Sequence, residues 1–152
     1  MSDAPRPPKP LADLLDEFRL LDRDERVEYL IEYAHEFESV PERIATRPYS
    51  EDHHVKRCQS DVFVWAETSG EDAQKYHFAV ENPQGISAQA FCAILDKTAS
   101  GARLADVAGI PGDIVFDIFG RDISMGKGEG LVGIVTAVTE FAKGALAERA
   151  TA

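Results

Sequence analysis

One cysteine of this chain follows a short run of basic side chains and has the setting of a nucleophile. Cys58 ends the stretch His53-His54-Val55-Lys56-Arg57-Cys58, in a chain whose formal net charge is −11. A cysteine reacts as its thiolate, and at the reference pKa only roughly 3% is ionised at pH 7. Nearby positive charge lowers the pKa of a thiol. The reversal of charge therefore predicts an activated cysteine supported by His53, His54, Lys56 and Arg57.

The second cysteine has the pattern of a packing residue. It belongs to a set of apolar residues that recur at helical spacing, namely Ala88, Phe91, Cys92, Leu95 and Ala99. Free cysteine is among the most buried residue types, so we predict that Cys92 lies in the core. For Cys58 the charged neighbours favour a reactive role, and inert packing is the alternative.

Length and composition place the chain in a broad class. With 152 residues, 44% hydrophobic and 28% charged, it suits one soluble domain. No apolar run approaches the roughly 20 residues that cross a bilayer, and the N-terminus lacks the pattern of a secretory signal. Two cysteines make no disulfide framework. We therefore expect a cytoplasmic protein that does not bind a membrane. Because the chain is acidic and has no basic patch, we also expect that it does not bind nucleic acid.

The N-terminal half is predicted to hold a tail and two helices. Residues 1–10 contain four prolines and form an expected disordered tail, which leaves residues 11–148 as a single domain. Asp22 and Glu25 have the spacing of a capping box at the start of the second helix. The two apolar stripes are Leu11, Leu14, Leu15 and Phe18, then Val27, Leu30, Ile31 and Ala34.

The remaining pattern predicts an α+β fold. Residues 60–67 indicate a strand covered on both faces, and residues 75–81 alternate as its antiparallel partner. Ser87 is the expected cap of the helix that carries Cys92 and that Gly101 ends. Residues 114–119 fit a strand or a buried helix, although Gly120 favours a helix end, and residues 131–145 trace a long amphipathic helix. We expect two N-terminal helices, a short antiparallel sheet of about three strands, and C-terminal helices packed on it.

Other chemistry that these residues allow is weaker. His53, His54 and Cys58 offer three metal ligands, but no further ligand completes a familiar spacing, so solvated loop histidines are favoured. A cysteine hydrolase needs a histidine base, and we interpret His35 and His77 as surface residues. Gly126-Lys127-Gly128 lacks the spacing of a phosphate-binding loop and is expected to turn the backbone into the last helix.

Three segments resemble the SufE family, sulfur acceptors in iron-sulfur cluster assembly. The stretch Val55-Lys56-Arg57-Cys58-Gln59-Ser60-Asp61-Val62 looks like the Cys-Gln-Ser core of that family. Residues 25–32 are similar to its second helix, and residues 124–131 resemble the segment that closes its active-site region. The three segments stand in the family's order, and the likeness spans residues 18–141.

The likeness has departures near the cysteine. Family members usually carry glycine where Arg57 stands, asparagine where His53 stands, and tryptophan where Phe63 stands. The family's loop arginine is replaced by Lys127. Glycine permits backbone angles that arginine resists, so the loop is expected to sit differently or to serve a different partner.

The resemblance implies a SufE/IscU-like fold and a persulfide relay. Cys58 would accept sulfur from a PLP-dependent cysteine desulfurase (SufS- or CsdA-like), stimulate it, and deliver the sulfur to a cluster-assembly scaffold (SufBCD-like). Gln59, Ser60 and Lys127 would support the site, without a resident cofactor or metal. Val62 and Val64 would shelter the thiol if strand alternation extends back to it. The alternatives are a non-catalytic adaptor, or a scaffold that itself binds metal or an iron-sulfur cluster, which generally needs several thiolates.

Overall fold

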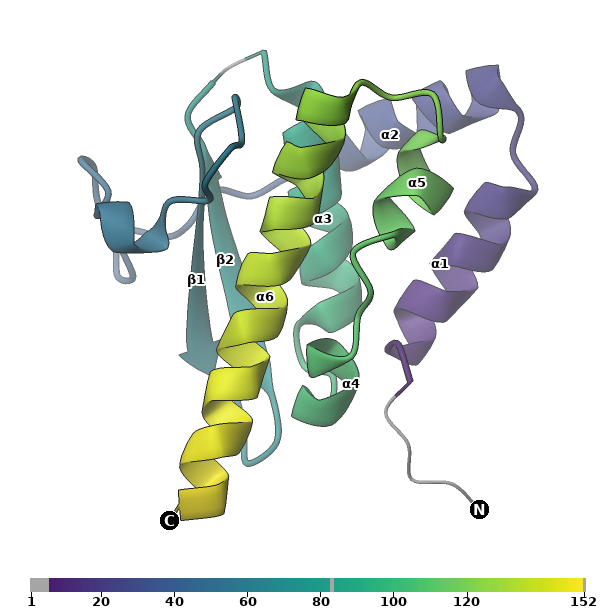
Figure 1. Cartoon of the computed structure of the whole chain (residues 1–152). Coiled ribbons are helices and arrows are strands. Elements are labelled where there is room, and N and C mark those ends of the chain that lie inside the picture. Colours follow the sequence, from purple (N-terminus) through teal and green to yellow (C-terminus); the bar gives the residue numbers. More distant parts are fainter. Residues whose placement is uncertain (1–5, 83, 152) are drawn as a thin grey trace, which may run out of the picture.

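The first helix buries the apolar stripe that the sequence predicts. The computed structural model of the protein describes residues 6–82 and 84–151 (Figure 1). Helix α1 (Lys9–Arg19) buries Leu11, Leu14, Leu15 and Phe18. Its first turn includes Lys9 and Pro10, so the ordered chain begins before the predicted end of the tail at residue 10. Residues 1–5 of that tail lie outside the described residues.

Helix α2 (Arg23–Glu36) begins where the capping box predicts, but it presents a different face to the core. The Asp22 carboxylate accepts from the Glu25 N–H, and the Glu25 carboxylate accepts from the Asp22 N–H. Val27 and Ile31 of the predicted stripe are 49% and 42% exposed, which corrects that prediction. Leu30 and Ala34 of the same stripe are half-buried, and so are Tyr29 and Tyr33 outside it. The Tyr29 ring meets the buried Phe18 ring edge-on at 5.9 Å, and this contact turns the helix.

The sheet is a two-stranded antiparallel hairpin. Strands β1 (Val62–Thr68) and β2 (Gln74–Val80) pair in register from Val62↔Val80 to Thr68↔Gln74. The prediction of about three strands is wrong, because within residues 6–82 and 84–151 other segments pair with the hairpin only through the isolated bridges Ser39↔Phe78 and His54↔Phe63. A single bridge holds each of the segments around Ser39 and His54 only weakly against the hairpin, so side-chain packing must fix their positions.

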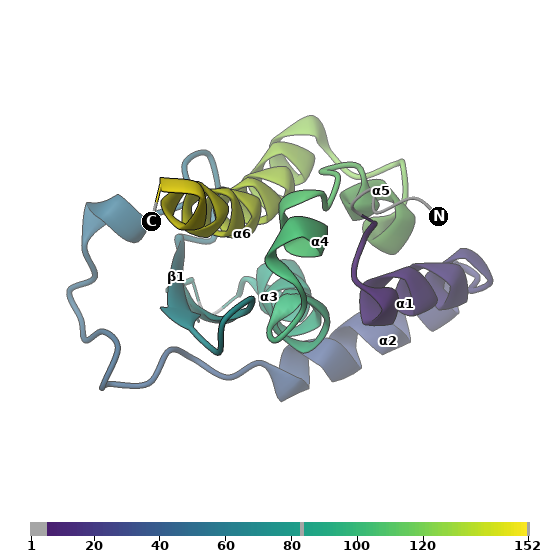
Figure 2. The ribbon, with the colours of Figure 1, turned by 90° about the horizontal axis from the view of Figure 1, so that it is seen from below.

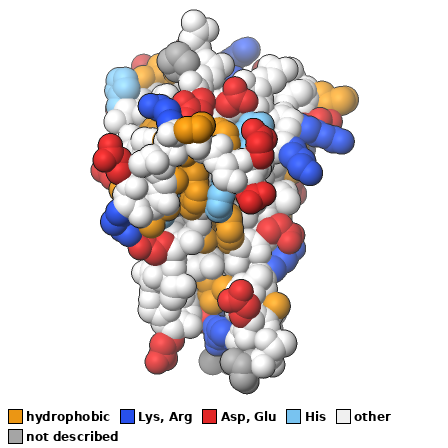
Figure 3. Space-filling model, turned by 90° about the vertical axis from the view of Figure 1, so that its left-hand side faces the viewer, with side chains coloured by type: hydrophobic (Ala, Val, Ile, Leu, Met, Phe, Trp, Pro, Cys, Tyr) orange, Lys and Arg blue, Asp and Glu red, His pale blue; other side chains and the backbone are white. Residues whose placement is uncertain are grey.

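Both faces of β1 are covered, as predicted. One face belongs to the main core through Val62 and Val64. The other face carries a second apolar cluster of Val40, Phe63, Trp65 and Ala79, over which Ile44, Ala45 and Tyr49 pack. Figure 3 shows apolar side chains at the centre of this face of the molecule, with charged side chains around them.

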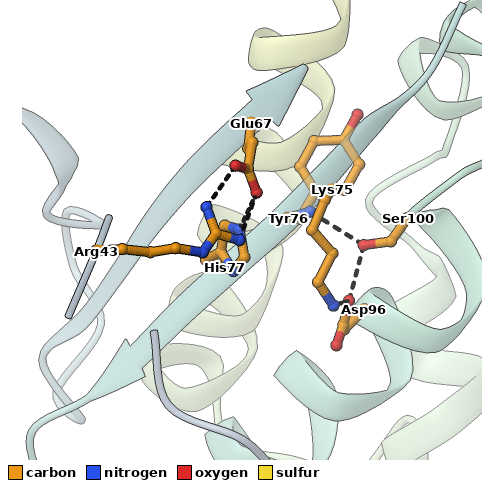
Figure 4. Close-up of polar contacts among 7 residues, drawn as sticks. All are labelled: Arg43, Glu67, Lys75, Tyr76, His77, Asp96 and Ser100. Atoms are coloured by element: carbon orange, nitrogen blue, oxygen red, sulfur yellow. Dashed lines mark hydrogen bonds and ion pairs between the residues drawn. The ribbon is translucent and has the colours of Figure 1, made fainter. Parts of the chain in front are cut away.

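Charged side chains hold the outer end of the hairpin (Figure 4). The Glu67 carboxylate accepts from Arg43 at 2.6 Å and contacts the His77 ring nitrogen at 3.0 Å, and these partners lower the pKa of Glu67 to about 2. His77 is 7% exposed, so the prediction that it is a surface residue is wrong. Its place on β2 directs it toward Glu67, one strand away. Asp96 likewise joins Lys75 to Ser100.

Helix α3 (Ile86–Ala99) lies at the centre of the fold. It contacts α1, α2, β2 and α6, and Figure 2 shows it between the hairpin and the N-terminal helices. All five residues of the predicted stripe are buried, and Cys92 is 0% exposed. The N-cap is Gly85 rather than Ser87, and Ser87 makes no capping bond. Gly85 takes this place because the chain turns sharply there, with its N–H bonded to the Asn82 carbonyl.

The C-terminal third is helical throughout. The 3-10 turn η1 (Glu51–His53) lies earlier in the chain, before the hairpin. After α3 come the helices α4 (Leu104–Ala108), α5 (Ile114–Phe119) and α6 (Met125–Thr151). The ambiguous segment 114–119 is therefore a helix, which ends at Gly120 with φ +93°. Gly126-Lys127-Gly128 belongs to the first turn of α6, so the predicted loop at this point is wrong. The helix also runs past residue 148, the predicted domain end.

Helix α6 is the main C-terminal wall of the core. Its length of 27 residues and its composition would suffice to cross a membrane, contrary to the expectation from the sequence. Its apolar face instead packs on β1, α3, α4 and α5. The residues that it buries include Leu131, Ile134, Val135, Val138 and Ala142. We interpret α6 as a core helix of an α+β domain.

Candidate functional site

Cys58 lies in a short loop whose two ends are tied together. The Val55 N–H donates to the Val62 carbonyl at 2.8 Å, and the bridge His54↔Phe63 follows directly outside it. Within the loop, the Asp61 N–H donates to the Cys58 carbonyl at 3.2 Å. Residues 55–62, here called the cysteine loop, thus form a closed turn between η1 and β1. Its backbone bonds fix where the cysteine points.

Two glycines of α6 let the cysteine loop lie directly on the helix. A Cβ atom at Gly130 would stand 3.1 Å from the Cys58 Cα and 3.3 Å from the Arg57 carbonyl oxygen. A Cβ atom at Gly133 would stand 2.9 Å from a methyl group of Val55. A side chain at either position would push the loop away. The segment 124–131 therefore closes the site by close backbone approach.

Arg57 adopts the backbone conformation that glycine would favour. Its φ is +66°, in the left-handed region, and Asp61 also has a positive φ of 51°. An L-residue pays roughly 1–2 kcal/mol for this conformation. Arginine here takes left-handed angles that a glycine would accept freely. The expectation that the loop sits differently or serves a different partner stays a prediction.

The thiol is sheltered, and the groups that bias its ionisation are not the predicted cations. Cys58 is 9% exposed and packs in the main core cluster with Val62 and Val64. Burial raises the pKa of the Cys58 thiol, and the carboxylate of Asp61 also raises it. Backbone N–H groups of Ser60 and Val62 bond to the sulfur and lower the pKa. The basic residues that precede Cys58 are not among the causes that shift its pKa, and the backbone amides offset the effect of burial only in part.

The four predicted cations point to other partners. The His53 ring stacks on Trp65 at 5.2 Å, and its Nδ1 lies 2.9 Å from the Val64 carbonyl. His54 Nε2 lies 3.2 Å from an Asp61 oxygen. Both rings are half-buried, so they are not solvated loop histidines. Lys56 is exposed, and Arg57 points outward with its nearest carboxylate 4.0 Å away on Glu129. The turn at residues 56–57 directs successive side chains apart.

Cys58 lies at the wall of a cavity of about 330 Å³, here called the thiol cavity. Gln59, Ser60 and Lys127 line it with the cysteine, as the sequence suggested for the site. It also contains Ser124 and Gly130 of the predicted closing segment 124–131, and residues that sequence reasoning missed as part of the site: Asn82, Gln84, Gly85 and Ser87. Of these residues only Ser87 had a predicted role, as a helix cap. The polar side chains of Asn82, Gln84 and Ser87 at the start of a buried helix were the available signal.

The thiol cavity offers polar groups rather than a metal site. Within residues 6–82 and 84–151, no group of three His, Cys, Asp or Glu side chains is arranged to hold a metal ion. His53 and His54 face Trp65 and Asp61 instead of converging on Cys58. The cavity brings hydroxyl and amide groups, one ammonium group and one thiol together. This set suits an anionic sulfur species better than a cation.

The fold and this site define a class of protein: a small α+β domain with one sheltered thiol beside a polar cavity. Comparison of the sequence with protein families gives the family. Residues 12–142 match the SufE family, described as an Fe-S metabolism associated domain. The chain belongs to the SufE family, and it is thereby associated with iron-sulfur metabolism.

Individual relatives are distant. Uncharacterized SufE-like proteins from two strains of Mycobacterium tuberculosis, CDC 1551 / Oshkosh and H37Rv, are each 24% identical over 111 residues. The matches cover 73% of this chain and 75% of each relative. The solution structure of a hypothetical protein from Thermus thermophilus superposes with a TM-score of 0.71 at 24% identity. That superposition covers 93% of this chain and 98% of the other, and it shows a shared fold.

Proposed function

We propose that the protein is a sulfur carrier that accepts sulfane sulfur on Cys58 from a PLP-dependent cysteine desulfurase. The observation that carries the proposal is the position of Cys58, which is sheltered yet forms part of the wall of the thiol cavity. A carrier needs one nucleophile, groups that hold its negative charge, and protection from free thiols. Membership of the SufE family supports this assignment.

The transfer is a thiol-disulfide type of exchange. The Cys58 thiolate attacks the outer sulfur of the persulfide on the desulfurase, a new S–S bond forms on Cys58, and the desulfurase cysteine leaves as thiolate. No net oxidation or reduction occurs, because one S–S bond replaces another. A second attack, by a cysteine of the receiving protein, then removes the sulfur from Cys58 in the same way.

The surroundings of Cys58 stabilise its thiolate only in part. Burial raises the pKa of Cys58, so at neutral pH the thiol stays mainly protonated and slow to react. In this proposal the N–H groups of Ser60 and Val62 stabilise negative charge on the sulfur once it forms, and the ammonium group of Lys127, which lines the same cavity, adds to this effect. Docking of the desulfurase exposes Cys58, so that the thiol reacts in the complex.

The proposal includes the partners and the compartment. The donor is a desulfurase of the SufS or CsdA kind, which the carrier stimulates by removing its persulfide. The receiver is a scaffold of the SufBCD kind that assembles the cluster. The exchange takes place in the cytoplasm, where thiol pools keep cysteines free. The carrier is an accessory of the desulfurase rather than a stand-alone catalyst.

Mass spectrometry after incubation with desulfurase, PLP and cysteine tests the proposal. We expect the wild type to gain about 32 Da on Cys58, the mass of one sulfur atom. Cys58→Ala is expected to gain nothing and to lose stimulation of desulfurase turnover. Cys92→Ala is the matched control and is expected to keep both. If Cys58→Ala stimulates turnover as well as the wild type, the protein is an adaptor that does not use its thiol.

The alternative of a cluster scaffold finds less support. A cluster is generally held by several thiolates, and the whole sequence contains two cysteines. Cys92 is fully buried in α3, and burial raises the pKa of its thiol strongly. Anaerobic reconstitution with iron and sulfide checks this point. A chromophoric cluster that depends on Cys58 would contradict the carrier proposal.

A further inference from the structure

A second cavity lies beside the thiol cavity and is lined by cations. It has a volume of about 650 Å³ and is bounded by α2, by the turn at residues 119–124 and by the start of α6. Its charged lining residues are Arg23, Arg26, Arg121, Lys127 and Asp122. The lining thus carries a formal charge of +3, in a chain whose net charge is −11. We call it the arginine cavity.

Arg26 is held inside this cavity without a partner. Its Nε is buried and has no hydrogen-bond partner among the described residues. A buried donor that is left unpaired is unfavourable, and charge increases the cost. A Cβ atom at residue 120 would stand 2.8 Å from the Arg26 Nη1, so Gly120 gives the guanidinium its space. The fold therefore places a guanidinium where an acceptor is missing.

The carboxylates of the protein leave this charge largely uncompensated. Asp122 approaches Arg23 at 3.7 Å, and both side chains are mostly exposed, so the pair is weak. Within the part of the chain that the structure describes, no carboxylate forms an ion pair with Arg26, Arg121 or Lys127. Clustered cations repel one another unless an anion lies between them. The missing acceptor and the excess charge point to the same kind of ligand.

We propose that the arginine cavity binds an oxyanion, a carboxylate or phosphate group, next to Cys58. A guanidinium donates two parallel hydrogen bonds to either group, which is the geometry that arginine serves best. The cavity shares Ser87, Ser124 and Lys127 with the thiol cavity, so the anion lies one wall away from the thiol. The anion comes from one of two sources, a free small molecule or an acidic side chain of a docked protein.

Titration of the full chain with inorganic phosphate tests the site. We expect saturable amide shifts in the NMR spectrum at residues 119–127, and no such shifts with sodium chloride at equal ionic strength. Arg26→Gln/Arg121→Gln should weaken phosphate binding at least about tenfold, since it removes two charged donors. Lys9→Gln/Lys143→Gln loses the same charge elsewhere on the surface and should bind phosphate as the wild type does.

Two outcomes would overturn the proposal: shifts that chloride reproduces, or phosphate binding unchanged in the arginine variants. The single variant Arg121→Gln guards against misfolding, because Arg121 is exposed and its loss leaves the half-buried Arg26 in place. It should still weaken phosphate binding measurably. These readouts need no desulfurase, so their failure is distinct from failure of the carrier proposal.

A competition experiment separates the two sources of the anion. Saturating phosphate is added while the affinity of the protein for a cysteine desulfurase is measured, with chloride at equal ionic strength as the reference. An affinity that phosphate lowers identifies the anion as an acidic side chain of the docked desulfurase. An unchanged affinity identifies it as a free small molecule. Either result requires that the site exists, which the titration decides first.

Discussion

The cysteine loop and helix α3 each bury one thiol, and the two thiols are set up for opposite purposes. Cys92 is 0% exposed among apolar side chains, and burial is the largest cause that raises the pKa of its thiol. Cys58 is 9% exposed and lines a cavity, and backbone N–H groups partly counter the effect of burial on its pKa. Burial alone therefore does not distinguish a structural cysteine from a functional one. The hydrogen-bond donors near the sulfur and the cavity beside it make this distinction.

The largest difference that we expect between the two thiols is in their rates of alkylation. In the folded protein Cys92 should react with iodoacetamide at least about a thousandfold more slowly than in urea, because its exposure requires global unfolding. Cys58 should be slowed by only about tenfold to a hundredfold, because opening of one loop exposes it. Peptide mapping after timed quenching gives both rates. A Cys58 rate equal to that in urea would show that the shelter is absent.

Substitution of Gly130 should break the shelter selectively. Gly130→Ala places a methyl group 3.1 Å from the Cys58 Cα, and the loop must shift. We expect a loss of about 1–3 kcal/mol in the free energy of unfolding and faster alkylation of Cys58. Denaturant titration and the alkylation assay measure the two effects.

Gly144→Ala is the matched control for this change. It lies in the same helix with nothing within 4 Å of the added atom. The substitution should stabilise the protein by about 0.5–1 kcal/mol through helix propensity, and leave the Cys58 rate unchanged. If both alanine variants behaved alike, the close approach at Gly130 would not matter.

Alkaline pH should separate the thiols by their contributions to stability. Because burial raises the folded-state pKa of Cys92 above its unfolded value, the stability it contributes is present below about pH 8.5 and is lost as the pH rises further. Each such thiol lowers the free energy of unfolding by about 1.4 kcal/mol per pH unit in that range. Cys92→Ala should therefore flatten the decline above about pH 8.5. Cys58→Ala should flatten it less, and a larger effect of Cys58→Ala would contradict the assignment.

The smallest effect concerns the left-handed residue before the functional thiol. Arg57→Gly relieves the positive φ of +66° and should raise stability by at most about 1 kcal/mol, since glycine also gains freedom in the unfolded chain. Arg57→Val, with a branched Cβ, should lower it by about 1–2 kcal/mol. Thermal unfolding of the two variants compares them. Equal midpoints would argue against strain at this position.

Much of the fold follows from patterns that act over one turn or one strand. The stripe that contains Phe91 and Cys92 is repeated at helical spacing, and Asp22 and Glu25 satisfy each other across three residues. These signals survive in the structure because local and tertiary forces agree. The face of α2 was predicted only in part: Leu30 and Ala34 turn inward, whereas Val27 and Ile31 stay exposed while the aromatic Tyr29 packs on Phe18.

The cysteine was found from the sequence, but its surroundings were not. The run from His53 to Arg57 suggested a cluster of charge, yet the turn that follows Val55 sends those side chains to separate partners. The N–H groups that bond to the sulfur belong to the backbone, which no side-chain pattern reveals. Asn82 and residues 84–87 reach the cavity only because α3 begins there. These contacts depend on the path of the folded backbone, which the residue types alone do not determine.

The first turns of α6 carry Gly126, Gly128, Gly130 and Gly133. In a helix each glycine costs about 1 kcal/mol relative to alanine, so this end of an otherwise strongly packed helix is its weakest part. Gly126 and Gly130 line the thiol cavity, and Gly133 lies against Val55 of the cysteine loop. Amide hydrogen exchange should therefore be faster in these turns than in the middle of α6, with the wall of the site fraying while the core stays intact. The absence of side chains at these glycines thus explains both the close packing of α6 against the cysteine loop and the low local stability of this end of the helix.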